Sequence, residues 1–340
     1  MGCHGCELWL AGGQLVAEVI QQLRSRGGWS ADQCQPQLGS VFQGLSPSQI
    51  YSRRVELAAQ TVGEKSGMLV DLVVDAIRRK AKCYAGLLGT MRAGHAGYAD
   101  QFEVPKCFPG RVATAARWGW PTDKENLAKP WLGGLPRLIF LSDMGDTLSH
   151  NVSFDYLKTE IIDNTNSETG RRHIWLWLSK RPTRMAEFGA WLHQQGIIWP
   201  DNLVAMTTVT SPSKSSRLDA LRHVPAKLKG LSLEPLFGPL NLNLAGIDWV
   251  IVGGGSDVLA EPFHVEWALE LRDRCRASGT AFFLKQLGRN AWFQNLPYAL
   301  VDEHGGDWNE WSEEWRVRQV PQAFCELKGR ASAPNPYSSS

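Results

Sequence analysis

Three cysteines carry the sharpest chemical signal in this sequence. Cys3 and Cys6 are separated by two residues, and 76 residues separate Cys6 from Cys83. Two thiolates at C-x-x-C spacing can hold one metal ion or one edge of an iron–sulfur cluster. A set of three protein ligands leaves one coordination position open to a small molecule. The spacing alone favours zinc, with His4 or Cys34 as a further ligand, and keeps an iron–sulfur cluster as the alternative.

The other cysteines and the chain ends bear on the cellular compartment. The first residues have no basic segment followed by an apolar one, so they do not predict a signal peptide. No apolar run approaches the roughly 20 residues that a membrane-spanning helix needs. We therefore expect a cytoplasmic protein without a membrane partner, in which the seven cysteines are thiols or metal ligands rather than disulfides. Cys107, Cys275 and Cys325 occur singly in apolar or helical contexts and are expected to be core thiols.

Polar or flexible residues follow six hydrophobic runs of the sequence. Lys180 and Lys285 could bind a carboxylate or phosphate group, or could pair with Glu234 and Asp143 in a buried network. A lone Gly-Gly-Gly does not have the spacing of a dinucleotide fingerprint, but its backbone could approach a ligand closely. The candidate catalytic residues are Lys180, Glu234 and Lys285, and the candidate cofactor-binding residues are Asp143, Asp146, Gly253 and Gly254.

The hydrophobic runs indicate how these residues are positioned. The runs are rich in β-branched and aromatic residues and alternate with stretches of helical periodicity. They occupy residues 137–143, 173–180, 202–209, 228–235, 248–255 and 281–288. Near-continuous hydrophobic strands imply a parallel sheet that is covered on both faces. We predict an α/β fold, a full or partial (β/α) barrel whose active face is the carboxyl end of its strands; an open doubly wound sheet is the alternative.

The amino-terminal region has a different pattern. Residues 14–82 have helical periodicity broken by a Gly/Ser/Pro-rich stretch, which predicts a helical insertion or cap between 1–13 and 83–325 of the barrel. The tail, 326–340, is expected to be disordered. The net charge of +2 does not by itself indicate a nucleic-acid partner. The basic run at 78–82 could contact phosphates, or it could be the solvated end of a helix.

Several ordered motifs resemble one family. The resemblance covers the first nine residues and most of the chain from 83 to about 320. The motifs are CHGCELW, KCYAGLLG, FLSDMGD, HIWLWLSKRPTRM, LSLEPLFGPL, DWVIVGGGS, FFLKQLG and HGGDWNEW. They resemble an uncharacterised phage- and bacteria-associated, three-cysteine family that is similar to radical S-adenosylmethionine (SAM) enzymes.

The resemblance implies a radical-SAM/TIM-like barrel with a [4Fe–4S] cluster. By position, Cys3, Cys6 and Cys83 would be the cluster ligands, and the remaining iron would bind SAM. The cluster would pass one electron to the sulfonium, and the resulting 5′-deoxyadenosyl radical would abstract hydrogen from an unknown substrate. Contacts to SAM or substrate are expected from Asp143, Asp146, Lys180, Glu234 and Lys285. A phage setting makes a nucleic-acid base or nucleoside a candidate substrate, and an external one-electron reductant is required.

The sequence shows three departures, of which the first is that the C-x-x-x-C-x-x-C loop usual in radical SAM enzymes is absent. The segment 14–82 replaces a short connection, and Gly255 stands where the family has a glutamate after the VIV run. The competing hypothesis is a non-enzymatic zinc protein that binds DNA or a protein partner. A metal-dependent hydrolase is disfavoured because the sequence shows no cluster of histidines and carboxylates.

Overall fold

The computed structural model describes residues 85–86, 88, 92–100, 104–257 and 260–331. Cys3, Cys6, Cys83 and the expected insertion 14–82 lie outside these residues. The described residues belong to two compact units: one contains those up to Cys107 together with Met144–Asn151, and the other contains Phe108–Asp143 and the residues from Val152 onward. No helix in the described part of the chain is long and apolar enough to cross a membrane.

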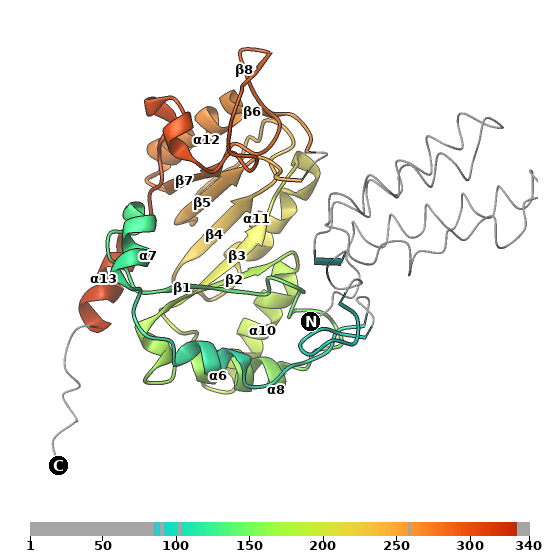
Figure 1. The fold of residues 1–340 in the computed structure, drawn as a ribbon. Coiled ribbons are helices and arrows are strands. Elements are labelled where there is room, and N and C mark those ends of the chain that lie inside the picture. Colours follow the sequence, from blue (N-terminus) through green and yellow to red (C-terminus); the bar gives the residue numbers. More distant parts are fainter. Residues whose placement is uncertain (1–84, 87, 89–91, 101–103, 258–259, 332–340) are drawn as a thin grey trace, which may run out of the picture. The chain divides into compact units, whose positions relative to one another are not determined.

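The larger unit is built on a parallel sheet of six strands, which forms a curled half-barrel (Figure 1). The strand order follows the chain without reversal. A doubly wound sheet needs a point at which the order reverses, so that alternative is wrong and the partial barrel is confirmed. All six strands fall inside the predicted runs: β1 (Leu138–Leu141), β2 (Ile174–Ser179), β3 (Leu203–Thr208), β4 (Lys229–Leu233), β5 (Trp249–Gly253) and β7 (Ala281–Gln286).

Helices connect most neighbouring strands, as the periodicity predicts. Between β1 and β2 the chain forms α8 (Phe154–Leu157), the π-helical turn η4 (Lys158–Ile162) and α9 (Asp163–Thr165). The later connections contain α10 (Pro182–Gln194), α11 (Ser216–Arg222) and α12 (Val265–Ser278). Between β4 and β5 the described residues form no helix, so the half-barrel has one connection made only of loop.

Shorter elements complete the larger unit. Before β1 lie α6 (Arg111–Ala116), α7 (Asp123–Ala128) and η3 (Pro130–Leu132). The single turns η5 (Gly170–Arg172) and η6 (Pro212–Lys214) lie in connections, and β6 (Phe263–His264), β8 (Ala291–Phe293) and β9 (Leu296–Pro297) form a small second sheet. The chain then forms η7 (Trp308–Glu310), η8 (Glu313–Trp315) and α13 (Gln322–Ala331). The helix α13 therefore continues past residue 325, where the expected tail begins.

The amino-terminal half of one sheet face packs against α13. Ile174, Val204 and Trp249 on this face join Phe324 of α13 in one buried cluster. Several residues of the same face nearer the carboxyl ends are less covered: Leu178 and Phe283 are only partly buried, and Phe140 is 44% exposed. Because α13 covers only the amino-terminal end, the carboxyl end of this face is the more open one.

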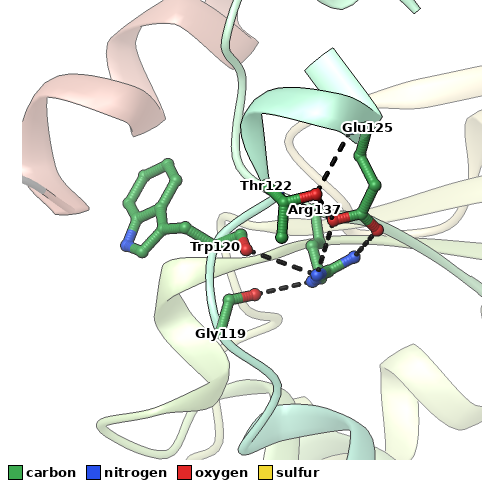
Figure 2. Close-up of polar contacts among 5 residues, drawn as sticks. All are labelled: Gly119, Trp120, Thr122, Glu125 and Arg137. Carbon is green, nitrogen blue, oxygen red and sulfur yellow. Dashed lines mark hydrogen bonds and ion pairs between the residues drawn. The ribbon is translucent and has the colours of Figure 1, made fainter. Parts of the chain in front are cut away.

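An arginine ties the start of β1 to the segment before it (Figure 2). Arg137 donates from Nε to the carbonyl of Gly119 at 2.6 Å and from Nη1 to Oε1 of Glu125 at 2.7 Å. Thr122 and Glu125 form a capping box at the first turn of α7. These hydrogen bonds lower the pKa of Glu125 to about 2. The cluster therefore fixes α7 beside the first strand of the half-barrel.

The expectation for the single cysteines is correct for only one of the three. Cys275 is buried on α12, and its burial raises the pKa of the thiol to about 12. Cys107 and Cys325 are exposed, so their assignment as core thiols is wrong. Phe324 on α13 is buried and successive helical residues point about 100° apart, so the exposed Cys325 faces away from the core.

Candidate functional site

An ion pair marks the carboxyl edge of the half-barrel. The Nζ atom of Lys285 lies 2.7 Å from Oε1 of Glu234. Glu234 directly follows β4 and Lys285 belongs to β7, so the pair reaches across β5, which lies between these strands. The side chain of Lys285 is 52% exposed and that of Glu234 is 20% exposed. The pairing expected as one of two alternatives is thus present, but it lies at an open edge rather than in a buried network.

The strand register places this pair on the same face as the partly covered residues. Thr208 pairs with Ser232, Ser232 with Ile251, and Ile251 with Phe283 across the four strands. Side chains two residues apart on a strand point to the same side. Glu234 and Lys285 each lie two residues beyond a member of this row. The ion pair therefore lies beyond the carboxyl end of a row of two buried hydroxyls and two partly buried apolar side chains, at a point where the register between β5 and β7 shifts and Gly253 pairs with Gln286.

Gly253 leaves room for the ion pair to cross β5. A Cβ atom at this position would lie 3.5 Å from the carboxyl carbon of Glu234 and 3.2 Å from Cγ of Gln286. A larger side chain would occupy the path between β4 and β7. The glycine therefore permits a direct contact between charges carried by strands that are not neighbours.

Gly254 serves a different purpose. A Cβ atom there would lie 2.1 Å from the backbone oxygen of Leu287, closer than any side chain permits. The N–H of Gly254 donates to the carbonyl of Gln286 at 3.1 Å, and its own carbonyl accepts from Nε2 of Gln286 at 2.9 Å. Both polar groups of Gly254 are thus engaged within the protein, and this glycine is required for the close approach of two backbone segments.

The other expected site residues come from other elements than the ion pair. Lys180 directly follows β2 and is exposed, and Asp143 lies two residues beyond β1, after Ser142 with its φ of 70°. Asp146 belongs to the other compact unit. There its Oδ1 accepts from the N–H of Leu148 at 3.0 Å and shapes its own loop. The structure therefore brings together Glu234, Lys285, Gly253 and Gly254.

Arg318 is the residue at this edge that the sequence analysis missed. It donates two hydrogen bonds to backbone carbonyls of β7 and lies against three tryptophan rings. Two of these rings, Trp308 and Trp311, come from the HGGDWNEW motif. The clustering of aromatic residues in that motif is the signal that could have drawn attention to this place.

Within the described residues, no group of three or more His, Cys, Asp or Glu side chains is arranged to hold a metal ion. The three cysteines expected to hold a cluster lie outside that part of the chain.

Comparison with known proteins gives one match. No curated protein and no solved structure matches the chain significantly. One family model matches residues 80–323, a span that contains Cys83 and all six strands of the half-barrel but neither Cys3 nor Cys6. Because this span is well over half of the 340 residues, the chain belongs to the family described as "Protein of unknown function (DUF5131)".

Proposed function

We propose that this protein is a radical SAM enzyme, with a [4Fe–4S] cluster held by Cys3, Cys6 and Cys83. The observation that supports the proposal best is the Glu234–Lys285 pair at the open carboxyl edge of a parallel partial barrel. In barrels of this kind the carboxyl ends of the strands form the active face. The pair offers one negative and one positive group at that edge.

The pair suits the amino-acid end of SAM. This end carries an ammonium group and a carboxylate, so the carboxylate of Glu234 can accept from the ammonium and Lys285 can donate to the carboxylate. Binding would replace one ion pair by two and would leave no charge without a partner. That exchange matters because an unpaired charge becomes costly once water is excluded from a site.

The row beneath the pair suits the rest of the ligand. Ser232 and Thr208 contribute buried hydroxyl groups, and Ile251 and Phe283 contribute apolar surface. Phe140, on the same sheet face, has an exposed ring on which a planar base could stack. These residues would orient the adenosine part and exclude water from it. A bound cluster would supply the single electron that cleaves the sulfonium.

The remaining candidates are proposed for the substrate. Lys180 and Asp143 follow neighbouring strands at the same edge of the sheet, away from the ion pair. An acidic and a basic side chain can both hydrogen-bond the polar edge of a nucleobase, which is the substrate class we propose. An external one-electron reductant would complete the system.

Metal analysis of anaerobically purified protein tests the proposal. We expect about four irons and four sulfides per chain, with a broad visible absorbance band that bleaches on addition of dithionite. One zinc per chain and no visible band after attempted reconstitution would instead support the zinc-protein hypothesis, for which salt-dependent DNA binding is the next measurement.

Ligand binding tests the assigned residues. S-adenosylhomocysteine is a suitable calorimetric probe because it has the same ammonium and carboxylate groups as SAM and is not cleaved. We expect Lys285→Ala to weaken its binding. Lys227→Ala is the matched control, because Lys227 is 51% exposed and lies 3.9 Å from Asp201. Equal effects of the two variants would remove Lys285 from the site.

A further inference from the structure

The segment that follows η8 pairs with β7, the edge strand of the half-barrel. Phe283 of β7 forms an antiparallel bridge with Arg318. The N–H of Leu284 donates to the carbonyl of Val317 at 2.8 Å, and the N–H of Gln319 donates to the carbonyl of Phe282 at 2.9 Å. Paired residues in an antiparallel ladder point to the same side. Arg318 therefore lies on the face that carries Phe283 and Lys285.

The guanidinium of Arg318 hydrogen-bonds to the backbone of β7 at Leu284 and Lys285. Its Nε donates to the carbonyl of Leu284 at 3.1 Å, and its Nη2 donates to the carbonyl of Lys285 at 2.9 Å. The same Nη2 donates to the carbonyl of Gly306 at 2.8 Å. One planar side chain thus links the carboxyl end of β7 to the loop that follows β9.

Three indole rings hold the guanidinium in this orientation. The centroids of Trp131, Trp311 and Trp308 lie 4.1, 4.9 and 5.2 Å from Cζ of Arg318. Trp131 also contacts Trp308 edge to face, with ring centroids 5.3 Å apart. Because Trp131 precedes β1 and Trp308 follows β7, the contact joins segments from the two ends of the sheet. Burial lowers the pKa of Arg318 to about 10, so the group stays charged at neutral pH.

We infer that Arg318 is a positioning residue, which fixes the β7 backbone so that Lys285 is directed at Glu234. A lysine side chain at an exposed edge has many rotamers, and one ion pair in contact with solvent restrains it weakly. Two hydrogen bonds from Arg318 hold the β7 backbone, and three tryptophan rings hold Arg318. The position from which the Lys285 side chain extends is therefore restricted. The part of the inference that concerns ligand affinity rests on the proposed function, but the restraint on Lys285 does not.

Limited acylation measures that restraint directly. The Nζ atom of Lys285 is in contact with the carboxylate of Glu234 at 2.7 Å, so acetic anhydride reaches it less easily than it reaches an amine that moves freely in solvent. Arg318→Lys keeps the charge but cannot donate to three carbonyls from one plane. We expect the acylation of Lys285 to rise about threefold or more in this variant, relative to Lys227 in the same sample, as mass spectrometry would show. An unchanged ratio would overturn the inference.

Arg316→Lys is the matched control. Arg316 lies two residues earlier and donates to the carbonyls of Asn309 and Trp311, in the same loop, but to no residue of β7. Because this loop also carries Trp308 and Trp311, loosening it should raise the acylation of Lys285 less than Arg318→Lys does. A rise equal to that in Arg318→Lys would mean that the loop as a whole, and not Arg318, restrains the lysine.

A double-mutant cycle on S-adenosylhomocysteine affinity tests whether Arg318 acts through Lys285. We expect Arg318→Lys to weaken binding about 5- to 20-fold in the native chain and less than twofold when Lys285 is already alanine. Equal losses in both backgrounds would show that Arg318 acts independently of Lys285. If the native protein binds no S-adenosylhomocysteine, the proposed function fails, and the acylation ratio alone decides the role of Arg318.

A second variant tests the inference if Arg318→Lys does not fold. If circular dichroism shows that Arg318→Lys is unfolded, Trp131→Leu removes the nearest ring and keeps all the donors. The same rise in acylation of Lys285, reduced in size, is then expected. No rise in a folded Trp131→Leu protein would contradict the inference.

Discussion

Glu234 and Lys285 form a 2.7 Å ion pair although β5 separates the strands that carry them. Gly253 presents no side chain where the pair crosses β5, and a Cβ atom there would already touch the carboxyl carbon of Glu234 at 3.5 Å. Two opposite charges are therefore held at the open edge of the half-barrel, above buried hydroxyl groups and apolar surface. This relationship is the basis of the proposed ligand site and of the predictions below.

The charge of Glu234 should matter more than its shape. Glu234→Gln keeps the size of the side chain but removes the negative charge that would accept from the ligand's ammonium group. A hydrogen bond to a charged group contributes roughly 1.5–3 kcal/mol, so S-adenosylhomocysteine should bind about tenfold more weakly or worse. Glu303→Gln is the control, because Glu303 pairs with Arg289 at 3.2 Å on the exposed surface. Unchanged calorimetric affinity of Glu234→Gln would remove this carboxylate from the site.

Substitutions at the two neighbouring glycines should have different effects, one on ligand affinity and the other on stability. Gly253→Val would crowd Glu234 and Gln286, and we expect it to lower ligand affinity while the protein stays folded. Gly254→Ala would force a methyl group against the carbonyl of Leu287, and should lower the free energy of unfolding by about 1–3 kcal/mol. Denaturant titration and calorimetry separate the two effects. Equal stability losses with equal affinity losses would contradict the division of roles.

The proposed cluster should depend on three thiols and not on the others. Replacing Cys3, Cys6 or Cys83 by Ala should abolish iron incorporation. Cys275→Ala should retain full iron content, because that thiol is buried on α12 with a pKa raised to about 12. Iron and sulfide analysis after anaerobic reconstitution checks each variant. Full iron in any of the first three variants would exclude that residue as a ligand.

The capping cluster at α7 predicts an acid-sensitive contribution to stability. The pKa of Glu125 is lowered from 4.5 to about 2, first by its hydrogen bond with Arg137 (Figure 2). A carboxyl group whose pKa is lower in the folded protein than in the unfolded chain contributes its full stabilisation at pH values above the unfolded pKa. This contribution is lost as the pH falls from about 4.5 toward 2. Glu125→Gln should therefore have a lower melting temperature than the native protein at pH 7. The difference should shrink below pH 4.5; a constant difference from pH 7 to pH 3 would contradict this account.

The strands could be predicted from the sequence because they are buried on both faces. The run IWLWLS is apolar except for its last residue and LVAMTT except for its last two, and their burial against α13 on one side and helices on the other explains that composition. The strand order was harder to predict, because alternating elements fit both a barrel and a doubly wound sheet. It follows from pairing between strands, which a single sequence does not show.

The site could be predicted only in part. Lys285, Glu234 and Gly253 were recognised because each follows or ends a hydrophobic run. Asp146 also follows such a run, but the chain passes into another compact unit at Met144, and hydrophobic pattern does not reveal that change. Arg318 was missed because its role depends on a β-bridge to Phe283 and on rings from distant segments. No local pattern encodes such contacts.

The formation of 5′-deoxyadenosine from SAM tests the central claim most directly. The experiment uses anaerobically reconstituted full-length protein with dithionite, and Cys83→Ala protein treated in the same way. We predict that the native protein forms 5′-deoxyadenosine and that the variant forms none. Native protein that holds a full [4Fe–4S] cluster but forms no 5′-deoxyadenosine, or a Cys83→Ala protein that forms as much, would contradict the assignment as a radical SAM enzyme.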